Sequence, residues 1–253
     1  MAIHFLRALT ARQRTLGANL TLGVSLAFIA GAINAAGFLA FAFYTSHMTG
    51  LVSSIADNLV LSQLSLVAAS VVAVIAFIVG AMSSTMMINW ARRNQMHSEY
   101  ALSLLLEAIL LLLFSVVSQR LKTQLIAYLP LSALMLCFIM GLQNAVATKL
   151  SSARIRTTHV TGIITDIGIE LGRLLYWNRS ADKNAHHFVA ADRNNLSIHL
   201  KILSAFLGGG ILGAYAFKHI GYEAVYALSL WLLVLAIVPA IDDARHWWQH
   251  RTK

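Results

Sequence analysis

A short polar pattern, His-x-Thr-Gly, occurs twice in an otherwise apolar chain, at 47–50 and again at 159–162. Histidine can carry a proton or hydrogen-bond a polar solute, and glycine after a hydroxyl residue lets the backbone turn or approach a ligand closely. A short helix beginning at each threonine would present its positive N-terminal end, which suits an anion or a carboxylate. The pattern predicts a substrate-binding site, whose residues from the two copies are His47, Thr49, Gly50, His159, Thr161 and Gly162.

The same residues have a simpler interpretation. The threonines could cap helices that lie at the membrane interface, and the glycines could allow close helix packing; the repetition leaves the two interpretations open. A metal site is not expected, because two histidines outside any His-x-x-His or His-Glu-x-x-His pattern are a poor ligand set. The single cysteine, Cys137, lies inside an apolar run. No cofactor is expected, and no enzyme activity, since no nucleophile–base arrangement is legible.

Amide side chains precede each copy of the pattern at matching places. The segment Phe-Ile-x-Gly-x-x-Asn-Ala occurs at 28–35 and again at 138–145, which places Asn34 in the first apolar run and Asn144 in a later one, next to Gln143. Amides inside a membrane helix either join helices by hydrogen bonds or line a polar path. Because Asn34 and Asn144 recur, we add them to the predicted substrate-binding residues.

Three acids lie in or beside apolar stretches and are candidates for proton coupling: Glu107, Asp57 and Asp166. An ionisable group within a membrane span is costly and therefore a functional suspect. Glu107 has the apolar Leu233 as its counterpart in the repeat, so a carboxyl hydrogen-bonded to a neighbouring helix is an equal alternative. Glu170 and Arg173, three residues apart, are better explained as an ordinary polar helix face.

Composition places the chain among multi-span membrane proteins. Of its 253 residues 58% are hydrophobic and 11% charged, with a mean hydropathy of +0.70, whereas soluble domains are about a quarter charged. A membrane helix needs about 20 mainly apolar residues. The predicted spans are 20–44, 64–90, 100–118, 124–147, 199–218 and 222–241; stretches 50–62 and 160–177 are short and polar and are predicted to be re-entrant or interfacial helices.

Basic residues predict the orientation. With six spans and the N-terminus inside, 16 of the 19 Lys and Arg residues fall on the inner side, and Arg120, Lys122 and Lys218 fall outside. This bias follows the positive-inside rule and explains the net charge of +9 without a nucleic-acid partner. We therefore expect a multi-pass protein of the bacterial inner membrane with both termini cytoplasmic.

Sequence matches between the two halves predict an internal repeat. Besides the segments above, Tyr-Ala-Leu-Ser-Leu occurs at 100–104 and at 226–230, and each copy opens the third span of its half. Repeats with an odd number of spans are inverted relative to each other, as in many transporters. We predict an all-α membrane protein with six transmembrane helices in two inverted three-helix repeats, each with a short broken or re-entrant helix. Its parts are a basic N-terminal segment 1–19, repeat 20–118 with short helix 50–62, repeat 124–241 with short helix 160–177 and polar insert 178–198, and a C-terminal tail 242–253.

These residues together resemble a known family. The Gly-x-x-Asn-Ala runs, His-Met-Thr-Gly at 47–50, Gly-Leu-Gln-Asn-Ala at 141–145 and Thr-Thr-His-Val-Thr-Gly at 157–162 are similar to the YoaK family of bacterial multi-pass membrane proteins, a domain of unknown function. The likeness spans about residues 20 to 240. It implies a fold and a bacterial inner membrane, and it brings no substrate. In that family an acid is expected more often where Asn34 stands, and a polar residue where Leu51 stands.

Two functions of different classes follow. The first is a secondary transporter or permeation protein for a small polar or anionic solute, with its site at the paired His-x-Thr-Gly segments. The second is a non-transporting scaffold, assembly or lipid-binding protein of the membrane. The lipid bilayer is the one partner that both require, and a homo-oligomer is compatible with either.

Overall fold

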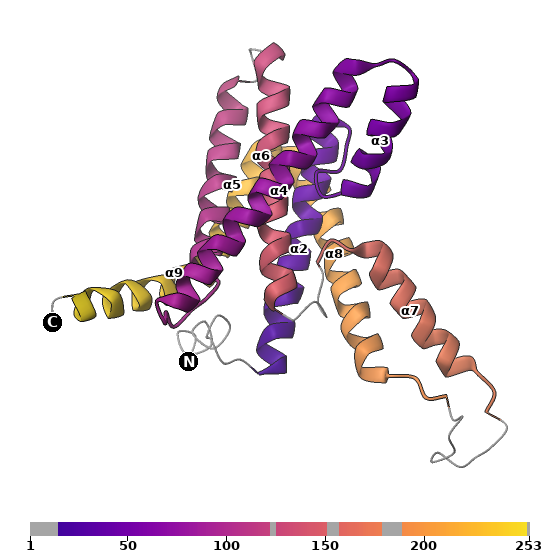
Figure 1. Ribbon diagram of the computed structural model, residues 1–253, viewed down its shortest axis with the longest axis vertical. Helices are drawn as coiled ribbons and strands as arrows, with labels where there is room; N and C mark the ends of the chain where they lie inside the picture. Colours follow the sequence, from indigo (N-terminus) through magenta and orange to yellow (C-terminus); the bar gives the residue numbers. More distant parts are fainter. Residues whose placement is uncertain (1–14, 122–124, 151–156, 179–188, 252–253) are drawn as a thin grey trace.

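A computed structural model describes residues 15–121, 125–150, 157–178 and 189–251, and all the regular elements in these ranges are helices (Figure 1). A 3-10 turn links the last two α-helices. In chain order they are α2 (Leu16–Phe41), α3 (Met48–Val60), α4 (Leu64–Arg93), α5 (Ala101–Leu121), α6 (Leu125–Leu150), α7 (Val160–Leu175), α8 (Arg193–Ile220), η1 (Gly221–Glu223) and α9 (Ala224–Arg251).

Several of these helices are long and apolar enough to cross a membrane. Five candidate spans occur in the described residues: Gly17–Phe41, Leu64–Arg93, Ala101–Arg120, Leu131–Leu150 and Arg193–Asp243. The last contains α8 and α9 and is interrupted at Gly221, whose φ is +63°. An all-helical, multi-span membrane protein, as the composition predicts, is therefore confirmed.

Two pairs of helices cross at unusually close range, α2 with α8 and α4 with α6. A Cβ added at Gly31 of α2 would lie 2.0 Å from the carbonyl oxygen of Phe206, and one at Gly209 of α8 would lie 1.9 Å from that of Phe28. The other crossing repeats this geometry, since Cβ atoms at Gly80 and Gly141 would lie 2.0 Å from the carbonyl oxygens of Phe138 and Phe77. All four helices thus use Phe-x-x-Gly, and small residues that let backbones touch are the usual means of helix association in lipid.

The interior is completed by the third helix of each half. Helix α5 packs against α9 and α6, and α2 contacts α6. The buried core contains side chains such as Leu26, Ile33, Phe114, Ile139 and Leu232, all at most 1% exposed. The helix contacts join the two halves of the chain. The first helix of each half packs against the second helix of the other, as α2 with α8 and α6 with α4. The two first helices, α2 and α6, also contact each other, and so do the two third helices, α5 and α9.

The two short helices lie apart along the longest axis of the molecule. Figure 1 shows α3 in the upper half and α7 in the lower half, each beginning at the end nearer the middle. Helix α3 packs against α4 and α7 against α8. Both short helices were predicted, and their observed bounds differ from the predicted 50–62 and 160–177 by two residues at most.

Two predicted boundaries are wrong in detail. The insert predicted at 178–198 is shorter than expected, because α8 begins at Arg193, where the carboxylate of Asp192 accepts hydrogen bonds from the backbone N–H groups of Asn194 and Asn195 at 3.0 Å. A side-chain cap of this kind stabilises the first helical turn. The tail predicted from 242 is helical through Arg251, as a continuation of α9.

Candidate functional site

The first His-x-Thr-Gly segment is held by Asn34. The side-chain amide of Asn34 donates to Ser46 Oγ at 2.6 Å, and its carbonyl oxygen accepts from the Ser46 backbone N–H at 3.1 Å. Asn34 lies seven residues before the end of α2, about 10 Å at 1.5 Å per residue. The connection to α3 therefore folds back along α2 before α3 begins.

The second segment is held the same way by Asn144. Thr158 Oγ1 donates to Asn144 Oδ1, while Asn144 Nδ2 donates to the Met140 carbonyl one turn earlier at 2.7 Å. Asn144 lies six residues before the end of α6, so Thr158 lies back beside that helix, away from its end. In each half the anchored hydroxyl residue directly precedes the histidine. Both asparagines bond the hydroxyl residue before the histidine, but with different atoms: Asn34 donates to the Ser46 hydroxyl and accepts from its backbone N–H, whereas Asn144 accepts from the Thr158 hydroxyl.

The helices that follow begin at the histidines rather than at the threonines. Helix α3 starts at Met48 with His47 as its N-cap, and α7 starts at Val160 with His159 as its N-cap. Neither histidine side chain caps its helix, in contrast to Thr15 of α2 and Asp192 of α8. The capping role considered for the threonines is therefore wrong, because Thr49 and Thr161 lie inside the first turn and are exposed. Within the described part of the chain, neither first turn has a side-chain cap, although the Met48 N–H donates to the Ser46 carbonyl at 3.1 Å.

Glycine has a different role in the two copies. A Cβ at Gly50 would lie 2.5 Å from Nδ1 of His47. The His47 ring therefore lies over Gly50, and the glycine makes room for it. At Gly162 an added Cβ would meet nothing within 4 Å, so His159 does not cover its glycine.

The two anchored segments are separate. Gln143 Nε2 on α6 donates to the Leu26 carbonyl on α2 at 3.3 Å, which places Asn144 near the level of Leu26. Asn34 lies eight residues further along α2, about 12 Å away along the helix axis. In the part of the chain that the structure describes, no hydrogen bond joins the Asn34–Ser46 pair to the Asn144–Thr158 pair.

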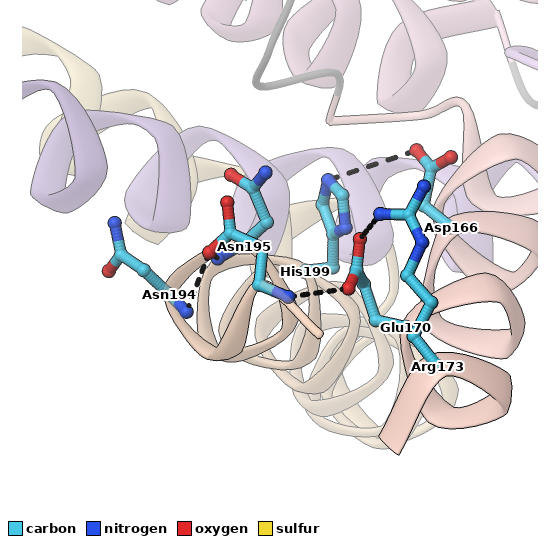
Figure 2. Close-up of polar contacts among 7 residues, drawn as sticks. Asp166, Glu170, Arg173, Asn194, Asn195 and His199 are labelled. Atoms are coloured by element: carbon cyan, nitrogen blue, oxygen red, sulfur yellow. Dashed lines mark hydrogen bonds and ion pairs between the residues drawn. The ribbon is translucent and has the colours of Figure 1, made fainter. Parts of the chain in front are cut away.

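Acids near α7 form a polar cluster with the start of α8, as Figure 2 shows. Glu170 is 6% exposed; its Oε1 accepts from Arg173 at 2.8 Å and its Oε2 from the Asp192 backbone N–H at 2.7 Å. One turn away, His199 Nε2 lies 3.8 Å from a carboxylate oxygen of Asp166. The pairing of Glu170 with Arg173 follows the sequence, but Glu170 is buried and bonded between helices rather than on an ordinary polar face.

The other predicted acids lie in contrasting places. Asp57 is exposed on α3, whereas Glu107 is completely buried on α5, with neither carboxyl oxygen hydrogen-bonded within the described chain. The described residues hold no group of three or more His, Cys, Asp or Glu side chains placed to bind a metal.

Sequence reasoning passed over Thr45 and Thr157, one residue before each anchored hydroxyl. Both are completely buried, and neither hydroxyl oxygen has a hydrogen-bond partner in the described part of the chain. The Thr45 methyl would lie 3.0 Å from a Cβ added at Gly37, so Thr45 packs directly on α2. The signal was available, since the matching segments begin Thr-Ser-His and Thr-Thr-His.

Comparison with known proteins agrees with the resemblance found in the sequence. A family model described as "Protein of unknown function (DUF1275)" matches residues 22–238. This range includes both His-x-Thr-Gly segments, both anchoring asparagines and the helices from most of α2 to the first half of α9. No curated protein and no solved structure matches the chain.

Proposed function

Because this chain belongs to the DUF1275 family of proteins of unknown function, we propose its function from its own geometry: a secondary transporter or permeation protein for a small polar or anionic solute. The observation that carries the proposal is the repeated fold-back, in which Asn34 and Asn144 hold Ser46 and Thr158 beside the start of α3 and α7. Interrupted helices with free N-terminal N–H groups are where many transporters bind substrate.

The proposed topology has six spans in two inverted repeats. Helices α8 and α9 are each long enough to cross a bilayer, with 28 residues apiece, and Gly221 separates them. The exchange of partners between halves, α2 with α8 and α6 with α4, supports a two-fold relation between the repeats, and the odd number of spans in each repeat makes them inverted. The placement of α3 and α7 in opposite halves of the molecule in Figure 1 agrees with it.

We place the protein in the bacterial inner membrane with both termini cytoplasmic, on the distribution of basic residues. In this orientation the re-entrant segment before α3 enters from the outer side and the one before α7 from the inner side. His47, Thr49 and Gly50 then serve one side, and His159, Thr161 and Gly162 the other, as successive contacts of a solute on its way across.

The test is solute uptake into vesicles that contain the purified full chain, screened over inorganic anions and small organic acids. We expect uptake by the natural protein and at least a several-fold loss in His47→Ala and His159→Ala. His219→Ala is the matched control, since this histidine lies at the end of α8 against Tyr215. Uptake that neither His47→Ala nor His159→Ala changes would remove the paired segments from the mechanism.

A non-transporting scaffold is the second candidate, and a specific observation favours it. The amides of Asn34 and Asn144 are occupied by local bonds, and the two anchors lie about 12 Å apart along the helix axes. A scaffold needs the asparagines for stability alone. Variants of the two histidines that fold normally, in a protein that moves no solute of the screen, would favour this candidate.

A further inference from the structure

The buried polar groups that the proposed site leaves unused lie on α5 and α6. Glu107 on α5 and Gln143 on α6 are both 0% exposed. Three of their oxygens have no hydrogen-bond partner among the described residues: both carboxyl oxygens of Glu107 and Oε1 of Gln143. The other polar atom of Gln143, Nε2, donates to the Leu26 carbonyl. A buried acceptor without a donor loses its bonds to water and gains none in return, so three such oxygens need an explanation.

Two interhelical hydrogen bonds fix how α5 and α6 face each other. The Tyr100 hydroxyl donates to the Lys149 carbonyl at 3.1 Å at one end, and Ser118 Oγ lies 3.2 Å from Ser132 Oγ at the other. The helices are antiparallel, and Glu107 lies seven residues after Tyr100 and eleven before Ser118. Both separations are close to whole numbers of turns on a helix of 3.6 residues per turn, so Glu107 is on the face that meets α6.

The same register places Gln143 opposite Glu107. Counting inward from the Tyr100–Lys149 bond or from the Ser118–Ser132 bond leads to residues 142 and 143 of α6 at the level of Glu107. Gln143 also lies eleven residues from Ser132, on the face of α6 that meets α5. Three acceptor oxygens of two facing side chains are therefore gathered at one depth of the bundle.

Among the described residues, no ion pair or hydrogen bond from a basic side chain reaches Glu107. The hydrogen bond between Ser84 and Ser103 puts the 76–84 segment of α4 at its level, and that from Ser229 to the Ala108 carbonyl puts the 226–234 segment of α9 there. These segments contain no Asp, Glu, Lys, Arg or His; their one titratable group is the Tyr226 hydroxyl, at the far end beside Gln119. On α6 Cys137 and Lys149 each lie six residues from Gln143, and Lys149 is at the helix end beside Tyr100; on α2 residues 22–30 carry no titratable side chain.

One proton would pair two of these three oxygens. A neutral carboxylic acid is a donor as well as an acceptor, whereas a carboxylate only accepts, and an isolated charge in hydrocarbon is costly. We propose that Glu107 and Gln143 form a proton-binding site within the membrane, in which protonated Glu107 donates to Gln143 Oε1 and exchanges this proton with water. On release the O–H bond breaks, the proton passes to a water molecule, and the electron pair stays on the carboxylate.

This site adds a coupling ion to the transporter proposed above and rests on that function. Loss of the proton leaves a carboxylate opposite an amide oxygen, and the repulsion favours a conformation that admits water to α5 and α6. Gln143 adjoins Asn144, which anchors Thr158, and it is bonded to α2, which carries Asn34. A change at Glu107 therefore acts beside Asn144, and through the bond to α2 on the helix that carries Asn34.

The proton site can be tested without any solute. In vesicles that contain the full natural chain, dicyclohexylcarbodiimide reacts with protonated carboxyl groups in apolar surroundings, and mass spectrometry of peptides locates the label. We expect labelling at Glu107 that falls several-fold as the bath is taken from acidic to alkaline pH, with none at that position in Glu107→Gln. Glu99, whose carboxylate is paired with Arg92 at 2.8 Å, is the internal control and stays unlabelled.

Labelling of Glu107 that is absent at every pH, or equal at every pH, would overturn the proposal, because the proton would then not exchange. Suppression by sodium ions at constant pH would overturn the proton in favour of a sodium site. Gln143→Met keeps the size of the side chain and removes the acceptor, so we expect the pH midpoint of labelling to move to lower pH; an unchanged midpoint contradicts the pair. Labelling that behaves as expected in a chain without uptake would reject the transport function and keep the proton site.

Discussion

The two short helices α3 and α7 start alike and are held differently. Both follow a segment that folds back along the preceding helix and is bonded to an asparagine there. Helix α3 has no buried residue. Helix α7 buries Ile163 against Ala27 and Ile202, and buries Glu170 in the polar cluster of Figure 2.

This difference distinguishes the features that both halves of the chain share from those found in one half. The asparagine anchors and the Phe-x-x-Gly crossings occur in both halves and position the backbone, so a substitution at one of them would displace a helix. Among the described residues, polar side chains that join a short helix to the next long helix are found at α7, where Glu170 bonds the Asp192 backbone N–H at the start of α8. We therefore expect α3 to separate from α4 more readily than α7 does from α8.

The largest effect is expected where the two halves are most alike. In Gly209→Ala and Gly141→Ala the new Cβ would lie 1.9 and 2.0 Å from a backbone carbonyl oxygen, so the helices must part. We expect each to lower the free energy of unfolding by about 3 kcal/mol. Gly208→Ala is the control, since its Cβ meets nothing within 4 Å. Unfolding midpoints in detergent measure all three, and unequal losses at positions 209 and 141 would contradict the equivalence of the crossings.

The anchors should differ by about a factor of two. Asn34→Ala removes two hydrogen bonds to Ser46 and leaves a backbone N–H without its acceptor, and we expect a loss of about 2 kcal/mol. Asn144→Ala removes one bond to Thr158 and one within its own helix, and about 1 kcal/mol is expected. The same unfolding measurement applies, with Asn58→Ala on α3 as a control that loses local bonds to Ser54 alone. Equal losses at Asn34 and Asn144 would mean that the backbone bond contributes nothing.

The sequence predicts those features of the fold and site that depend on a few consecutive residues, and not those that depend on contacts between distant residues. Apolar runs and the repeated Asn-Ala and His-x-Thr-Gly segments predict the helices and the special places, since each lies within a few consecutive residues. The partners of those places are not local: that Asn34 bonds Ser46 requires the chain to fold back along α2. Two of the four Phe-x-x-Gly segments, at Phe28 and Phe138, lie in the sequence repeat and could be noticed there. The other two, at Phe77 and Phe206, are recognised only from the helices that they contact in the structure.

The polar cluster of α7 tests whether the two short helices differ as stated. Glu170→Gln keeps the shape of the side chain and weakens its bonds to Arg173 and to the Asp192 backbone N–H. We expect a loss of about 1 kcal/mol and faster hydrogen exchange in the first turn of α8. Asp57→Asn on α3 is the matched change, and should alter neither quantity because Asp57 is exposed. Exchange at the start of α8 that stays unchanged in Glu170→Gln would show that the cluster does not hold α7.

The smallest effects should have opposite signs at the two glycines of the repeated pattern. Gly162→Ala adds a methyl group in open space and favours the helix, and we expect a gain of up to about 1 kcal/mol. Gly50→Ala places a Cβ 2.5 Å from His47 Nδ1, so the ring must turn away, and the same gain is reduced or reversed. Because the clash involves one flexible side chain, removing that side chain by His47→Ala should restore the stabilisation. The double variant with Gly50→Ala and His47→Ala, compared with His47→Ala alone, should then show the same gain as Gly162→Ala. A loss at Gly50→Ala that persists without His47 would place the strain in the backbone of the first turn, and would make the two starts differ in fold as well as in side chains.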